Sequence, residues 1–512
     1  MPRTDSFARF FPRWRKEILL GLMVFLYLLG IALLRGTYGT EDALSLSEIV
    51  VFSVLPLIVG AFTRSKVGVI GGILVASMVP FQKTIALVFI ISVLVSMLML
   101  FRSGSVRNLM KDTAARFFFV YLGWLFLLWI IRLGGSTDVW SFPILFGSMI
   151  SIPLFYLILF IGFVWSKGER SQLRRLFVTL LLAQSAVVIA YPLLIGHPVL
   201  YLAGANGLFK GFNLLFNFGV QLPYGDPDWN RGTLVDSHQI GFLLAILTAL
   251  LFASAHYFRQ KTLIVAGLVG IYLFGITETS HAVPAFIAGL FLAGVAAFFL
   301  ERGMRLHIIT SLLLICITLF PVILATSIYG GNTSFSQTRK AFLYRSTIEQ
   351  LTQDPTTLLI GYGPGTFGSR VSNKRLPAEY GYIEYPFPIV VGERVAPAYA
   401  VAMRQAGKGS GGATAQVQVS GLVSLVAESG VIGTIIFLLF VAVLCEKMLL
   451  MIATSNDITA KILAITGLFT VVLISGSLCF RQYFEYPQIM SFVWLIVLIS
   501  GFGESNRLLR DG

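Results

Sequence analysis

The feature that most limits the fold is a series of long apolar runs that follow one another along almost the whole chain. A helix needs about 20 mainly apolar residues to cross the hydrocarbon core of a bilayer. About fourteen runs approach that length, although Lys83 almost joins the third run to the fourth. The runs are 18–34, 44–62, 67–82, 84–101, 117–133, 143–165, 176–195, 239–257, 262–279, 281–300, 306–327, 427–450, 462–480 and 488–503. This pattern predicts an all-α polytopic membrane protein.

Composition agrees with that class. Charged residues make up 12% of the 512 residues, whereas soluble domains carry about 25%. The net charge of +14 does not indicate nucleic-acid binding, because most basic residues lie in short loops between apolar runs. The cysteines Cys316, Cys445 and Cys479 lie within apolar runs and imply no disulfide framework. The basic segment before residue 18 lacks a following small-residue cleavage site, so we expect a retained first helix.

The basic loops predict an orientation. Lys and Arg gather in alternate short loops, at 1–17, 64–66, 102–116, 166–175, 259–261, 302–305, 461 and 507–510. The positive-inside rule assigns these loops to the cytoplasm, and both termini with them. The chain then divides into N-terminal membrane helices (1–195), a first outer loop (196–238), further membrane helices (239–327), a long outer loop (328–426) and C-terminal membrane helices (427–512). We expect the long outer, or periplasmic, loop to be partly helical.

The most patterned part of the long loop is Ser336–Phe367. Ser336 can cap a helix, apolar residues then recur at helical spacing, and Asp354-Pro355 is a stop signal. A short apolar run and a glycine-rich turn, Gly361–Gly365, follow. Basic residues crowd the helix start, where the helix dipole favours anions. Either these residues are solvated, or an anion binds there.

Four places carry residue types suited to chemistry at a membrane surface. Arg231 and His238 lie where the first outer loop meets a helix. Either the arginine binds a phosphate and the histidine acts as a base, or both are ordinary residues of a helix start. Glu278 and His281 fall between two apolar runs. Either they are the polar residues that a tight outer turn needs, or they are functional, because ionisable groups near membrane depth are costly and often mark function. The other two places contain Arg339, Arg345 and Glu428.

Arg339 and Arg345 are six residues apart, so a regular helix would separate them by about 120°. They could bind one pyrophosphate only from its two sides, and the alternative is a solvated helix face. Glu428 lies on a helix that we expect to run along the interface at 416–433 before entering the membrane. It is either a buried structural acid or a base. The sequence contains no zinc spacing, phosphate-binding loop, nucleophile elbow or paired aspartates for a metal.

Taken together, these stretches resemble the O-antigen ligase and O-antigen polymerase family of bacterial envelopes, over about Arg231 to Gly433. The family pattern has an outer-loop arginine before a helix start, a Ser-Arg element, an arginine-bearing helix with a Gly-x-Gly-x-Gly turn, and a helix with Glu-x-Gly. The matching residues are Arg231–Leu234 with Ser237 and His238, Ser280–Ala282, Arg339, Arg345, Asp354, Pro355, Gly361–Phe367, and Leu422, Leu425, Glu428, Gly430 and Gly433.

Two positions depart from the family pattern. His281 stands where the family keeps an arginine, which replaces a permanent charge with a titrating one. Val419-Ser420-Gly421 stands where the family often has His-Asn, and in ligases that histidine is thought to activate the acceptor. The second departure favours a polymerase-type member over a ligase, or shifts the role of the base to His238 or His281.

The resemblance implies a metal-independent glycosyltransferase of the bacterial inner membrane, without a cofactor, that polymerises polyprenyl-diphosphate-linked oligosaccharide repeat units on the periplasmic side. Arg231, Arg339 and Arg345 would bind the diphosphate. His238, His281 or Glu428 would activate the acceptor, with His238 first because it follows Arg231 by two helical turns. The implied partners are the lipid-linked glycan, membrane lipids, a chain-length regulator and other envelope polysaccharide proteins, with no nucleic acid. A ligase is the alternative within the family, and a polysaccharide or lipid transporter or flippase is the alternative of another class.

Overall fold

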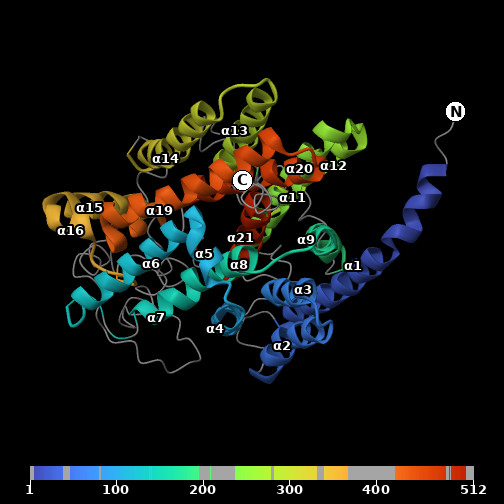
Figure 1. Ribbon diagram of the computed structural model, residues 1–512, viewed down its shortest axis with the longest axis horizontal. Helices are drawn as coiled ribbons and strands as arrows, with labels where there is room; N and C mark the ends of the chain where they lie inside the picture. Colours follow the sequence, from blue (N-terminus) through green and yellow to red (C-terminus); the bar gives the residue numbers. More distant parts are fainter. Residues whose placement is uncertain are drawn as a thin grey trace. The chain divides into compact units, whose positions relative to one another are not determined.

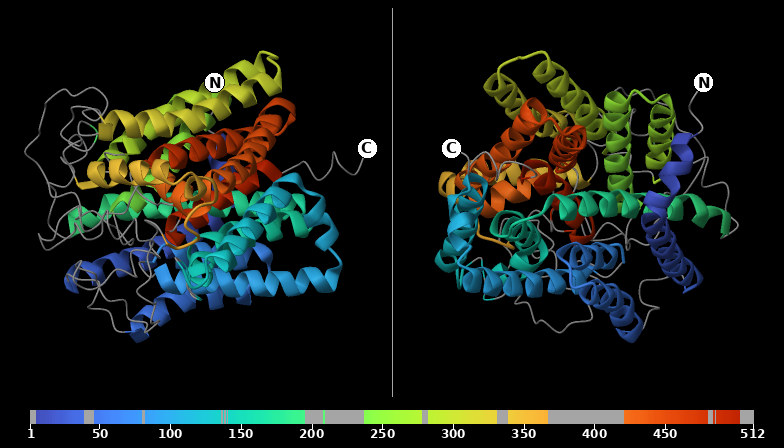
Figure 2. Two further views of the ribbon diagram at one scale, coloured as in Figure 1. Left: turned by 90° about the vertical axis from the view of Figure 1, so that its left-hand side faces the viewer. Right: turned by 45° about the vertical axis from the view of Figure 1, so that its right-hand side comes forward.

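The computed structural model is built from helices (Figures 1 and 2). It describes residues 5–38, 46–79, 82–135, 137, 139, 141–194, 208, 237–277, 282–330, 339–366, 421–479, 484 and 486–502. Over these residues no β-strand forms, and 10 helices are long and apolar enough to cross a membrane. Four shorter apolar helices accompany them. The all-α polytopic class is therefore confirmed, while the number of fourteen spans and the orientation of the termini stay predictions.

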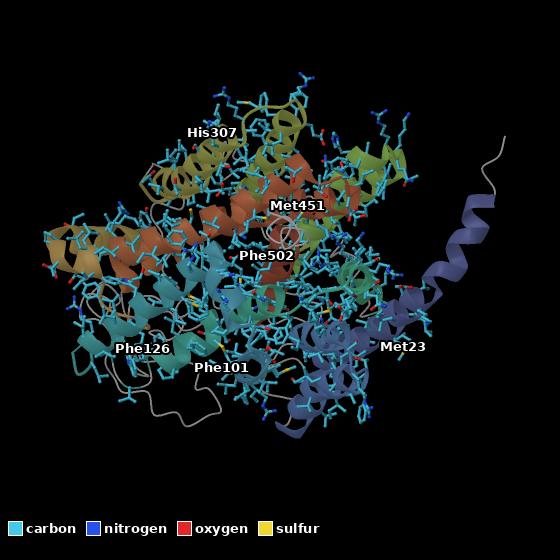
Figure 3. All side chains as sticks on the ribbon, in the orientation of Figure 1. Met23, Phe101, Phe126, His307, Met451 and Phe502 are labelled. Atoms are coloured by element: carbon cyan, nitrogen blue, oxygen red, sulfur yellow. The ribbon has the colours of Figure 1, made fainter. Side chains whose placement is uncertain are left out.

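Many large apolar side chains point outward from the helices (Figure 3). Phe101 is 69% exposed and Met23 is 61% exposed. A protein in water rarely exposes so much contiguous apolar surface, whereas lipid chains solvate such side chains readily. The outward-facing residues thus fit a protein that is surrounded by lipid.

The chain separates into two compact units. Unit 1 comprises Met1–Val88 and Val164–Val283, and unit 2 comprises Phe89–Phe163 and Pro284–Gly512. The units therefore join segments that the linear division of the sequence kept apart. Helix α4 (Gln82–Ser103) contains the first boundary between them.

Unit 1 contains six further helices. They are α1 (Asp5–Tyr38), α2 (Leu46–Phe62), α3 (Lys66–Ser77), α9 (Lys167–Leu194), α11 (Ser237–Phe258) and α12 (Lys261–Ile276). Helices α2 and α3 can approach closely because Gly72 has no side chain. A Cβ atom at this position would lie 2.5 Å from the carbonyl oxygen of Pro56. Helix α1 packs along α9, where Glu17 and Arg175 form an ion pair at 2.5 Å.

Unit 2 contains the helices that bear Arg339, Arg345 and Glu428. Its helices are α5 (Val106–Lys111), α6 (Thr113–Ile131), α7 (Ser141–Leu145), the π-helix η2 (Phe146–Ile150), α8 (Ser151–Gly162), α13 (Val283–Glu301), α14 (Leu306–Gly330), α15 (Arg339–Gln353), α16 (Pro355–Ile360), α19 (Gly421–Thr454), α20 (Ile458–Ser477) and α21 (Pro487–Phe502). Every residue of α8 and α21 is buried, so these two helices form the centre of the unit. An apolar helix with no exposed face is what a helix surrounded by other helices requires.

Helices α6 and α19 lie side by side and run antiparallel (Figure 1). Phe118 packs on Phe440, and Tyr121 packs on Phe437 one turn further along α6. At one end of the pair, Lys447 Nζ lies 2.8 Å from Asp112 Oδ2. At the other end lies the candidate site.

Two details differ from the sequence-based expectation. The apolar run after Asp354-Pro355 forms a short helix, α16, because Asp354 caps it and Pro355 occupies its first turn. The helix that bears Glu428 begins at Gly421, and it is continuous with the following membrane helix except for one break at Gly430.

Candidate functional site

The candidate site is built around the break in α19. Gly430 has φ 69° and ψ 176°, which no α-helix tolerates. In an unbroken helix the carbonyls of Ala427, Glu428 and Ser429 would accept hydrogen bonds from the N–H groups four residues later. Here all three accept from other segments, because buried carbonyls need partners.

The donors come from the glycine-rich turn and from α6. Tyr362 N donates to the Ala427 carbonyl at 2.7 Å, and Gly363 N donates to the Glu428 carbonyl at 3.1 Å. The indole Nε1 of Trp124 donates to the Ser429 carbonyl at 2.8 Å. The break is therefore a three-way junction of α6, α19 and the turn after α16.

Two glycines make this junction possible. A Cβ atom at Gly430 would lie 2.2 Å from the Leu359 carbonyl oxygen, and one at Gly361 would lie 2.6 Å from the Glu428 carbonyl oxygen. Both residues also have positive φ, 69° and 84°, which side-chain-bearing residues rarely adopt. The Gly-x-Gly turn and the Glu-x-Gly helix thus need glycine because their backbones touch.

Glu428 ties the turn to α19 through its side chain as well. Its Oε2 accepts a hydrogen bond of 2.9 Å from Gly365 N, and the residue is 6% exposed. A carboxylate that accepts a buried backbone N–H is a strong positioning contact. The structure therefore gives Glu428 a role in holding the turn, and its role as a proton acceptor stays a prediction.

Arg132, which the sequence analysis did not select, lies beside the same turn. Its Nη2 donates to the Gly361 carbonyl at 3.0 Å. The pKa of Asp354 lies below its ordinary value, mainly because the hydroxyl and the amide of Thr357 donate hydrogen bonds to its carboxylate. The Thr356 amide and the positive charge of Arg132 lower it further. Burial raises the pKa of Tyr362, an effect to which Asp354 adds and which Arg132 opposes. The only local signal for Arg132 was a cation at the end of an apolar run.

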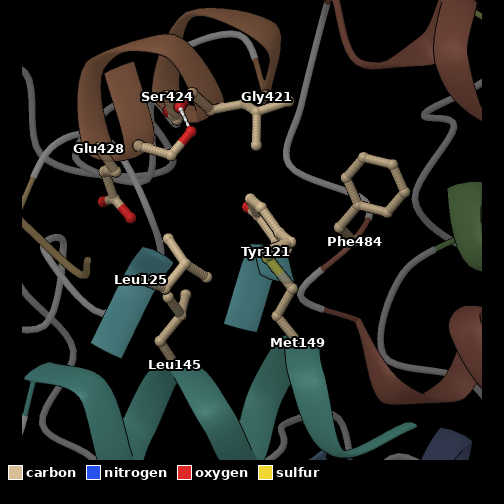
Figure 4. Close-up of a pocket in the computed structure, with 10 residues that line it drawn as sticks. Tyr121, Leu125, Leu145, Met149, Gly421, Ser424, Glu428 and Phe484 are labelled. Carbon is tan, nitrogen blue, oxygen red and sulfur yellow. Dashed lines mark hydrogen bonds between the residues drawn. The ribbon is translucent and has the colours of Figure 1, made fainter. Parts of the chain in front are cut away.

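A small, partly open and mostly apolar pocket lies next to the junction (Figure 4). One wall comes from α6, α7 and η2, and the other comes from the part of α19 that precedes the break, with Phe484. The lining residues are Tyr121, Leu125, Leu145, Met149, Gly421, Ser424, Leu425, Glu428, Ser429 and Phe484. The candidate base Glu428 therefore reaches a space that a small group can enter.

Helix α15 presents one of the predicted arginines. Tyr344, Thr347 and Leu351 are buried along one face of this helix, and burial raises the pKa of Tyr344 to about 12. Arg345 follows Tyr344 and is exposed. Because α15 contacts both α16 and α19, Arg345 belongs to the same unit as the junction.

The other predicted residues are only partly described. Arg231 and His281 lie outside the described residues, as does Glu278. His238 is in the first turn of α11, in unit 1, and Arg339 is the first residue of α15, but the placement of both side chains lies outside the described part. Of the six predicted site residues, the structure thus describes the side chains of Arg345 and Glu428, both in unit 2.

Within the described part of the chain, no group of three or more His, Cys, Asp or Glu side chains is arranged to hold a metal ion. The polar groups at the junction are a carboxylate, a guanidinium and hydroxyls. They can accept a proton from a bound hydroxyl, stabilise a negative charge or orient a substrate.

Comparisons of the chain with protein-family models, with curated proteins and with solved structures each returned no significant match.

Proposed function

We propose that the protein is a membrane glycosyltransferase that polymerises polyprenyl-diphosphate-linked oligosaccharide repeat units into a cell-surface polysaccharide. The observation that carries this proposal is the junction. The Gly361–Gly365 turn and the Glu428-x-Gly430 helix are two separate parts of the family pattern, and they meet through backbone hydrogen bonds and through the Glu428 carboxylate. A pattern whose distant parts contact each other is what a shared site requires.

In the proposed reaction, a sugar hydroxyl of one repeat unit attacks the anomeric carbon of another. The new glycosidic C–O bond forms as the bond to the polyprenyl diphosphate breaks, and the diphosphate leaves with the electron pair. Arg231, Arg339 and Arg345 neutralise its developing charge. The hydroxyl proton passes to His238, His281 or Glu428.

The glycans that accumulate when the gene is deleted test the reaction type. A polymerase predicts that single lipid-linked repeat units accumulate, because they are the unused substrate. Long lipid-linked chains would instead assign the protein as a ligase that moves a finished glycan to a lipid core or protein. Unchanged lipid-linked glycans inside a cell that fails to expose them would favour a transporter.

The proposed site faces the periplasm, and this orientation has its own test. Cysteines introduced at Gly204 and Lys374 should react with an impermeant thiol reagent added to intact cells, and one introduced at Gln172 should not. Labelling at Gln172 would reverse the topology and remove the proposal that the reaction takes place outside.

Two sets of variants test the assigned residues. Arg345→Ala and Arg345→Lys should both lose most activity at normal protein levels, because lysine lacks the two-point grip of a guanidinium. Arg107 is an exposed arginine on α5, so Arg107→Ala serves as the control and should stay active.

His238→Ala should abolish turnover. Near-normal activity in this variant, together with an inactive Glu428→Gln, would move the role of the base to Glu428. Restoration of EDTA-treated protein by a divalent ion would contradict the metal-independent mechanism.

A further inference from the structure

The pocket beside the junction is lined by a buried hydroxyl, that of Ser424, which takes no part in the hydrogen bonds of the junction. Ser424 is 3% exposed, and its hydroxyl has no hydrogen-bond partner within the described structure. Buried hydroxyls are nearly always paired, since a protein–water hydrogen bond is lost on burial. A buried hydroxyl that lines a pocket without a partner indicates a ligand group that supplies one.

The neighbours of Ser424 narrow the chemistry of that ligand. Glu428 lines the same pocket and is 6% exposed. Tyr121 and Ser429, whose side chains also carry hydroxyls, belong to the same lining. A buried carboxylate repels an anion in a poorly solvated space, so a phosphate group is disfavoured here. A neutral hydroxyl can donate to the carboxylate and exchange a hydrogen bond with Ser424.

The remaining lining favours the same class of ligand. Leu125, Leu145 and Met149 make the wall from α6, α7 and η2 apolar, and Phe484 adds a further apolar side chain to the lining. A sugar ring has an apolar carbon face and an edge that carries hydroxyls. It therefore matches a pocket that has both apolar and polar side chains in its lining. A plain alkyl chain would fill the apolar side but leave Ser424 unpaired.

We propose that this pocket is the acceptor subsite, and that it binds an uncharged, hydroxyl-bearing edge of the acceptor sugar with Ser424 and Glu428 as its polar contacts. The assignment to an acceptor sugar rests on the proposed glycosyltransferase function. In this arrangement Ser424 is a positioning residue that orients the hydroxyl toward the Glu428 carboxylate. The diphosphate of the donor binds elsewhere, because the same carboxylate excludes it.

The charge selectivity of the pocket can be measured without any turnover. In the full-length protein, Ser424→Cys is treated with a neutral methanethiosulfonate reagent and with an anionic one of similar size. The ratio of the two rates cancels any change in the reactivity of the introduced thiol. Ser103→Cys, an exposed position in the same unit, is the matched control, and the parent protein gives the background from the native cysteines.

The neutral-to-anionic ratio should be about tenfold larger for Ser424→Cys than for Ser103→Cys, because the Glu428 charge repels the anionic reagent. Adding Glu428→Gln, which keeps the shape and an acceptor for Gly365 N, should bring the ratio close to the control. Equal ratios at the two positions would overturn the proposal, whatever reaction the protein performs.

A second measurement tests the sugar. Lipid-linked repeat units isolated from the deletion strain should slow modification of Ser424→Cys by the neutral reagent, whereas polyprenyl phosphate without a sugar should not. Protection by both lipids, or by neither, would overturn the acceptor assignment. Failure of the proposed function itself is distinguishable, because the deletion strain would then not accumulate single repeat units.

Discussion

The two ends of the α6–α19 pair are fastened in opposite ways. At the Lys447 end, side chains form the connection: Lys447 pairs with Asp112, and Asp112 also caps α6 through the amides of Ala114 and Ala115. At the Gly430 end, the acceptors are backbone groups: three successive carbonyls of α19 accept from the amides of Tyr362 and Gly363 and from the indole of Trp124.

The difference shows how each end responds to substitution. Side chains can rotate and neighbouring groups can relax, so the Lys447 end can lose one contact and keep the others. At the Gly430 end, a Cβ atom added at Gly430 or Gly361 would lie 2.2 or 2.6 Å from a carbonyl oxygen of the neighbouring segment. Such backbone groups cannot rotate away as a side chain can. The end that carries the candidate site is therefore the end that tolerates least change.

The largest effect is expected for Gly430→Ala. A Cβ atom there meets the Leu359 carbonyl, and alanine also resists the positive φ. We expect a loss of about 3 kcal/mol or more in the free energy of unfolding, with loss of activity. The midpoint of thermal unfolding in detergent measures the change.

Gly123→Ala is the matched control, since a Cβ atom at Gly123 in α6 meets nothing within 4 Å. It should leave the midpoint unchanged or raise it slightly, because alanine favours a helix. Equal midpoints for Gly430→Ala and Gly123→Ala would contradict the tight contact at the junction.

Trp124→Phe should have the next largest effect. Phenylalanine keeps an aromatic ring but removes the donor to the Ser429 carbonyl. We expect a loss of about 1–3 kcal/mol, the typical cost of a buried acceptor without a partner. Trp494→Phe, whose ring stacks on Phe440, controls for the smaller ring, and a larger loss there would argue against the hydrogen bond as the cause.

Lys447→Met at the other end should cost less, about 1–2 kcal/mol, because this largely buried ion pair lies between an exposed pair and a hydrogen bond to a fully buried charge. Methionine keeps the apolar stem near Phe502 while Asp112 keeps its contacts with the amides of α6. A double-mutant cycle with Asp112→Asn isolates the ion pair. If Lys447→Met destabilised the protein more than Gly430→Ala, the contrast between the two ends would be reversed.

Asp354→Ala should have the smallest effect, and the effect should depend on pH. Hydrogen bonds from Thr357 and from the amides of α16 lower the pKa of Asp354 below its ordinary 3.8. A group with a lowered pKa in the folded state stabilises it fully above the ordinary value, and this contribution is lost as the pH falls through the folded-state pKa. The midpoints of the parent and Asp354→Ala should therefore differ at pH 7 and converge in strong acid; a difference that grows on acidification would refute the capping role.

Local patterns predicted the elements of the fold and part of the site. Apolar runs located the helices that are long and apolar enough to cross a membrane, Asp354-Pro355 located a helix boundary, and spacing singled out Gly361–Gly365 and Glu428. Each of these signals lies within a few residues of the feature that it predicts. The same reasoning could not show that the turn and Glu428 touch, since 63 residues separate Gly365 from Glu428.

Arg132 and Trp124 were missed for the same physical reason. Their partners lie 229 and 305 residues away, and nothing near them in the sequence distinguishes them from a basic helix end and a membrane tryptophan. The π-helix at Phe146–Ile150 was also missed, because its residues read as part of one apolar run.

The separation between Trp124 and its acceptor also sets an order of events during synthesis. A chain grows at about 5–20 residues per second, so the Ser429 carbonyl is made roughly 15–60 s after the indole that donates to it. During that interval the indole of Trp124 and the guanidinium of Arg132 exist without their acceptors, which are carbonyls of α19 and of the Gly361–Gly365 turn. The junction is therefore among the last contacts that a newly made chain can form, and a chain that stops before Gly430 never forms it.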